Sequence, residues 1–174
     1  GMEIPHTRTH ALGSFVWDAP LKHLPEDFAL LKARAPTVDR VETHRRLDLA
    51  WFVFGYTMDA RLRGRPWWSM GLTREAAELV GLERLMELMV DDPASVHRLM
   101  GFLRDDWLGF QDWMEREHLL MPMNEGDYTG SGGFGYSDEL HAHGRDSVGF
   151  TDQWGFAEAQ ETSGISPAMF DEFV

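Results

Sequence analysis

Two carboxylates and an amide stand at the start of a glycine-rich stretch, where Asn124, Glu125 and Asp127 follow the apolar residues 119–123. Two carboxylates whose pKa values are split by burial can act as general acid and general base. Glu125 and Asp127 are therefore the candidate catalytic residues. In the alternative interpretation, the same side chains only cap or brace the loop.

The loop that follows supplies candidate substrate contacts. Glycine lets a backbone approach a ligand closely, and polar groups on a loop that follows a buried strand are typical of a binding site. A plain surface loop is the alternative. Further along, the alternation in residues 154–160 places Glu158 and Gln160 on one face of an expected strand. The predicted substrate-binding residues of these two stretches are Asn124, Tyr128, Gly132, Gly133, Tyr136, Glu158 and Gln160.

Two more clusters carry ligand chemistry. Trp67 and Trp68 follow three arginines in residues 61–65, and arginine forks match the geometry of carboxylates. Core tryptophans beside arginines paired with acids are the alternative. His141 and His143 lie just after two acids, and imidazole with carboxylate suits zinc. A solvated loop is the alternative there, because an isolated His-x-His is a weak signal.

Composition narrows the classes of function. The formal net charge is −13, which argues against nucleic acid and against an anionic membrane surface. The chain has no cysteine and no apolar run of about 18 residues, so it predicts neither a disulfide framework nor a membrane span. We therefore expect a cytoplasmic protein whose partner is a small-molecule substrate.

Several local signals predict the elements that would position these residues. Helices are expected from Pro25, from Asp39 to Phe54 with Gly55 as the stop, and from Arg74 to Val90 with Thr73 as the cap and a break at Gly81. The end of the second of these, Trp51 to Phe54, also suits a strand. Another helix begins at Asp92-Pro93 and carries one apolar stripe, and a last begins at Ser166-Pro167. Strands are expected over residues 58–63, 119–123 and 154–160. Residues 1–37 are expected to form an N-terminal arm with a short helix. The stripe consists of Val96, Leu99, Met100, Leu103, Trp107, Phe110 and Met114.

Three stretches in this order resemble the uroporphyrinogen decarboxylase-like superfamily, most closely its uncharacterised branch, which is related to methylcobamide:coenzyme M methyltransferases. They read PWWSMGLTREAAELVGLERLMELMVDDPASVHRLMGFLRDDWLGF, NEGDYTGSGGFGYSDEL and WGFAEAQETSGISPAMFDEFV. The most recognisable short pieces are Pro66-Trp67 and Ser166-Pro167-x-x-Phe170. The resemblance spans residues 38–174.

The resemblance implies an α/β fold, a partial (β/α)8 TIM-barrel section with long helices and a glycine-rich loop. A whole barrel needs about 250 residues, and the chain stops soon after Ser166-Pro167 opens an apolar helix, so we expect a fragment that is inactive alone. The parent would be a lyase that decarboxylates a carboxylated tetrapyrrole, or a methyltransferase that works with a corrinoid partner or zinc.

The chain departs from the superfamily in three ways. It has no Arg-Gln-Ala-Gly-Arg stretch, no Phe-Ser-Asp and no cysteine for a zinc site. Neither activity is therefore carried over residue by residue. The alternative function is a non-catalytic module for small-molecule binding or self-association. Because a partial barrel exposes strand edges and apolar helix faces, we expect a homo-oligomer in both cases.

Overall fold

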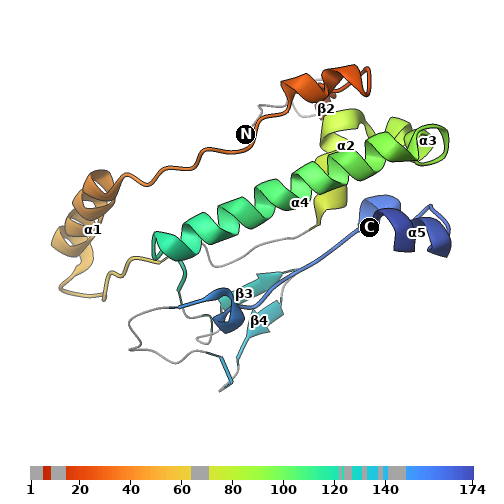
Figure 1. Ribbon diagram of the computed structural model, residues 1–174. Coiled ribbons are helices and arrows are strands. Elements are labelled where there is room, and N and C mark those ends of the chain that lie inside the picture. Colours follow the sequence, from red (N-terminus) through yellow and green to blue (C-terminus); the bar gives the residue numbers. More distant parts are fainter. Residues whose placement is uncertain are drawn as a thin grey trace. The chain divides into compact units, whose positions relative to one another are not determined.

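The structure is a computed structural model that describes residues 6–8, 15–63, 71–121, 123, 127–130, 133–136, 139–140 and 148–174. This part of the chain is mostly helical, and its strands form two separate two-stranded antiparallel sheets (Figure 1). The predicted α/β fold with a partial (β/α)8 barrel is wrong. A barrel needs parallel strands side by side, and no described strand has a parallel neighbour.

The chain divides into two compact units, each built from separate stretches. Unit 1 comprises Gly1–Arg34, Ser69–Gln111 and Phe156–Val174, and unit 2 comprises Ala35–Trp68 and Asp112–Gly155. The hydrophobic core of unit 1 joins α2 (Leu72–Val80), α3 (Leu82–Asp91), the first part of α4 (Pro93–Arg116) and α5 (Pro167–Phe173), the helices labelled in Figure 1. Its most deeply buried members include Leu21, Ala76, Leu85, Val96 and Leu99.

Gly81 separates α2 from α3, as the sequence predicts. It adopts a φ of 94°, a backbone conformation that L side chains rarely take, and its N–H donates to the carbonyl of Ala77 at 2.8 Å. The chain can therefore turn between two short amphipathic helices, which both bury their apolar faces. The first of them, α2, begins at Leu72 with Gly71 as its N-cap. Thr73, the predicted cap, is instead a buried residue within α2.

The long helix α4 begins at Pro93, as the Asp92-Pro93 pair predicts. Proline suits the first helical position, and the Asp92 carboxylate accepts from the Ser95 hydroxyl at 2.6 Å. The predicted stripe is largely confirmed, because Val96, Leu99 and Leu103 belong to the core of unit 1. After Gln111 the helix continues into unit 2, where Met114 is buried.

Unit 1 also contains the first sheet and a short 3-10 helix. β1 (His6–Arg8) pairs antiparallel with β2 (Phe15–Trp17), in a region expected to be irregular. η1 (Glu26–Leu30) follows Pro25, where a helix start is predicted. The Asp27 carboxylate accepts from two preceding backbone N–H groups, and the Arg98 guanidinium lies 4.2 Å from the Phe28 ring centroid. The contact of Arg98 with Phe28 joins η1 to α4.

Unit 2 contains α1 (Arg40–Phe54) and the second sheet. Asp39 caps α1 by accepting from the Glu42 N–H at 2.8 Å, and Gly55 follows the last helical residue, so both predicted ends are confirmed. Arg40 donates to the carbonyl and to the carboxylate of Glu117, each at 2.8 Å. β3 (Asp127–Gly130) pairs antiparallel with β4 (Gly133–Gly135), with an irregularity between Tyr128 and Gly130.

The three predicted strands do not form in the described residues. Residues 59–63, 119–121 and 123 have no regular structure, and residues 154–160 contain a single isolated bridge at Phe156. Apolar residues there are buried by packing rather than by strand pairing: Met121 and Met123 are buried, and Arg63 Nε donates to Met121 Sδ at 3.3 Å. None of the described helices is long and apolar enough to span a membrane.

Candidate functional site

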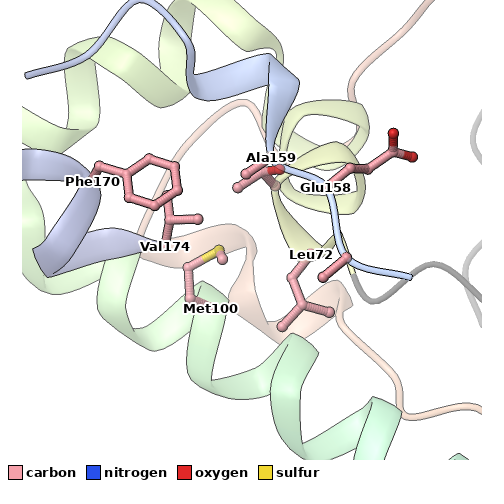
Figure 2. A pocket seen from close by; sticks show the side chains of 8 residues that line it. Leu72, Met100, Glu158, Ala159, Phe170 and Val174 are labelled. Atoms are coloured by element: carbon pink, nitrogen blue, oxygen red, sulfur yellow. The ribbon is translucent and has the colours of Figure 1, made fainter. Parts of the chain in front are cut away.

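A pocket of about 350 Å³ lies in unit 1, where the last part of the chain passes over α2 and α4. Figure 2 shows Phe170, Val174 and Met100 grouped on one side of it, with Leu72 and Ala159 opposite. Its walls are mainly apolar, as in most small-molecule sites. The lining residues are Leu72, Thr73, Met100, Ala157, Glu158, Ala159, Phe170 and Val174.

The last helix, α5, places two of these side chains. Ser166 is its N-cap, with its hydroxyl accepting from the Met169 N–H at 3.3 Å, and Pro167 is the first helical residue, as predicted. Phe170 and Val174 are four residues apart and therefore share a helical face that lines the pocket. Phe173 points into the core instead, with its ring 4.9 Å from that of His97.

Two threonine hydrogen bonds fix the opposite wall. The Thr73 hydroxyl donates to Glu161 at 2.9 Å, and the Thr162 hydroxyl donates to the carbonyl of Ala159 at 2.7 Å. Both threonines are almost fully buried, so each hydrogen bond satisfies a polar group that would otherwise be costly to bury. The bonds tie η3 (Gln160–Thr162) and the preceding residues to α2.

Glu158 supplies the negative charge of the pocket. In Figure 2 its carboxylate points away from Phe170 and Met100, which puts the charge at the rim rather than on the apolar wall. The Gln160 amide donates to this carboxylate at 3.0 Å. The arrangement suits a compact apolar molecule that carries a cationic or hydrogen-bond-donating group. The only hydroxyl among the described lining residues is that of Thr73, and it donates to Glu161.

A second, larger pocket of about 520 Å³ lies on another side of α2 and includes the half-exposed ring of Trp17. The arginine of this pocket already has a partner, because Arg74 Nε donates to the Glu78 carboxylate at 2.9 Å, and this hydrogen bond raises the pKa of Arg74. Glu161 lines this pocket and accepts from Thr73 of the first pocket. One hydrogen bond therefore joins the walls of both pockets.

Sequence reasoning missed a cluster of charges that joins the segment after η1 to α2 and α4. Arg34 Nε lies 2.6 Å from the Asp106 carboxylate, and the Arg34 guanidinium lies 4.6 Å from the Trp107 ring centroid. Trp107 Nε1 in turn donates to Glu75 at 2.8 Å. Burial raises the pKa of Glu75, while the Trp107 hydrogen bond and the charge of Arg34 act in the opposite direction. No residue of this cluster lines either pocket, so we interpret it as structural.

The residues predicted from sequence fall into three groups. Trp67, Trp68, Asn124, Glu125, Gly132, His141 and His143 lie outside the described residues. Asp127, Tyr128, Gly133 and Tyr136 belong to unit 2, where the first two form part of β3 and Tyr136 is well exposed after β4.

Glu158 and Gln160 form the third group and belong to unit 1, where Glu158 lines the first pocket and Gln160 donates to its carboxylate. They do not share a strand face as predicted, because Gln160 begins η3. Thr73 and Glu161, which fix the wall, are 88 positions apart in the chain, and no local pattern reveals such a pair.

Metal binding at His141 and His143 stays a prediction. Elsewhere, the described residues contain no group of three or more histidines and carboxylates able to hold a metal ion. Compared with protein-family models, characterised proteins and solved structures, the chain gives no match.

Proposed function

We propose that this chain binds a compact, mainly apolar small molecule with a cationic or donating group in the pocket of unit 1. One observation carries the proposal: the apolar wall of Phe170, Val174 and Met100 adjoins the carboxylate of Glu158 at the rim. The formal net charge of −13 adds an attraction for cations and a repulsion for anions.

A second candidate is an enzyme function that resembles that of the uroporphyrinogen decarboxylase-like superfamily. It is favoured by where the pocket residues lie in the sequence, since Leu72, Met100 and Phe170 all fall in stretches that carry the resemblance. The reaction would be decarboxylation of a carboxylated tetrapyrrole or corrinoid-dependent methyl transfer. The charge of the chain opposes a polycarboxylate, so binding of a small cation remains our first proposal.

Titration of the protein with 2-phenylethylamine, followed by NMR shifts of backbone amides, tests the first proposal. We expect saturable shifts in residues 157–162 and in α5. Phe170→Ser should weaken binding about tenfold, the effect of losing an apolar contact worth about 1.4 kcal/mol. Leu108→Ser is the matched control, because Leu108 is similarly exposed on α4 but lines neither pocket.

Two further ligands separate the candidates. Glu158→Gln should weaken binding of the amine but leave 2-phenylethanol, its neutral counterpart, unchanged. Uroporphyrin, a polycarboxylate, should produce no shifts. Saturable binding of uroporphyrin without binding of the amine would favour the tetrapyrrole enzyme, whereas equal loss of amine binding in both serine variants would refute the pocket.

A further inference from the structure

The C-terminal half of α1 in unit 2 is apolar and lies in solvent. None of the residues of α1 is buried. Leu49, Phe52, Val53 and Tyr56 are 53%, 89%, 56% and 101% exposed. Their spacing of three, four and seven residues places them along one helical face. Tyr56 lies in a hydrogen-bonded turn at the helix end, where the N–H groups of the next two residues donate to the Phe54 carbonyl at 2.8 and 2.7 Å.

The area of this face is large for a patch left in solvent. A whole aromatic side chain buries about 150–250 Å², so the exposed parts of Phe52 and Tyr56 present about 300–500 Å² on this face. Leu49 and Val53 are also more than half exposed and add to it, while Trp51 and Phe54 extend the apolar surface on the other side of the helix. The largest apolar patch of a typical monomer is about 300–600 Å², whereas each side of a standard interface covers about 800 Å².

We propose that the apolar half of α1 is a homodimer interface that takes the same surface of a second copy of this chain. In a two-fold arrangement with the helices antiparallel, Phe52 packs beside Val53 of the partner, and Leu49 packs opposite Tyr56. In this arrangement the uncharged face of one copy lies against the same uncharged face of the other copy.

The charges at the other end of α1 favour the antiparallel order. Glu42 accepts hydrogen bonds from Arg45 at 2.6 and 2.8 Å and from Arg46 at 2.8 Å, which leaves this half of the helix rich in arginine. In an antiparallel pair the two arginine-bearing halves lie at opposite ends, while a parallel pair would bring them together. Because each copy carries a formal charge of −13, added salt should strengthen association by screening the long-range repulsion.

Sedimentation equilibrium of the whole chain at 1–100 µM tests the interface. We expect the wild-type protein to be a dimer, more tightly associated in 0.5 M than in 0.05 M salt. Phe52→Glu should raise the dissociation constant at least about 30-fold, as loss of a central aromatic contact does. Circular dichroism checks that the helix content is kept.

Val41→Glu is the matched control, because Val41 is 83% exposed on the same helix but lies in its charged half. It should leave the dimer intact. A wild-type monomer at 100 µM would overturn the proposal, and so would equal dissociation of both variants or a Phe52→Glu protein that remains dimeric. The pocket of unit 1 is untouched by either variant, so a negative result here leaves the proposed function standing.

Discussion

The helices α4 and α1 contain similar apolar side chains, but they use them differently. Along α4 these residues recur every three or four positions, so one stripe enters the core and Val96, Leu99 and Leu103 are buried. In α1 the apolar residues are gathered in the last part of the helix, and none is buried, although Leu49, Phe52 and Val53 have the same spacing. The comparison shows that a stripe of apolar residues does not by itself place a helix in the core of its own unit.

The largest effect is expected at the centre of the α4 stripe. Leu99 is fully buried, so Leu99→Ala removes its packing and leaves a cavity, at a cost of about 2–5 kcal/mol in the free energy of unfolding. Leu49→Ala, made in the Phe52→Glu background where α1 stays uncovered, should change it by less than about 0.5 kcal/mol. Urea denaturation measures both. Similar losses at the two sites would contradict the contrast between the helices.

A smaller loss of stability is expected when the partly buried ion pair of Arg34 in unit 1 is removed. Arg34→Ala removes the pairing with Asp106 and the contacts with the rings of Trp107 and Phe110, so we expect a loss of about 2–3 kcal/mol. Arg84→Ala, which breaks an exposed pair with Glu87, should cost less than about 1 kcal/mol. Thermal and urea unfolding compare them, and equal values would show that partial burial adds nothing to the Arg34 pair.

The smallest effect concerns the pH dependence of the same cluster. Because burial raises the pKa of Glu75, its carboxyl keeps its proton to higher pH in the folded state than in the unfolded chain. Its stabilising contribution is present below the ordinary value of 4.5 and is lost as pH rises through the raised pKa. Glu75→Gln should abolish this loss, since the amide oxygen still accepts from Trp107.

At pH 7 the Glu75→Gln protein should therefore be as stable as the wild type or more stable, by less than about 1 kcal/mol. Denaturation curves from pH 4 to pH 8 give the difference in unfolding free energy at each pH. The exposed change Glu87→Gln is the control. A Glu75→Gln protein that loses stability relative to the wild type as pH rises would show that the Arg34 charge outweighs burial.

Local signals predicted the helix ends well. Asp39, Gly55 and Ser166 act through hydrogen bonds with residues one helical turn away, and Pro93 acts through its fixed backbone angle, so both kinds of signal can be seen in the sequence. The predicted strands failed because a strand requires a distant partner. Apolar residues such as Met121 are buried in an irregular segment after α4, as they would be in a strand. Their pattern in the sequence therefore does not distinguish a strand from an irregular buried segment.

The candidate site was predictable only in part. Glu158 and Gln160 were predicted to contact a substrate, which stays a prediction; Glu158 lines the pocket, and Gln160 donates to its carboxylate. The wall residues Phe170 and Val174 were recognised only as an apolar helical face. The bond between Thr73 and Glu161 joins distant parts of the chain, and it becomes visible only when the fold brings α2 and η3 together.

The sequence of α1 also has a consequence for protein quality control. Trp51, Phe52, Val53 and Phe54 all favour β-structure, so this uncharged stretch is the kind of segment that aggregates when it is exposed as an extended chain. Arg45, Arg46 and Asp48 stand shortly before it, where charged gatekeeper residues oppose aggregation. We therefore expect the helical state of α1 to protect this segment from misassembly.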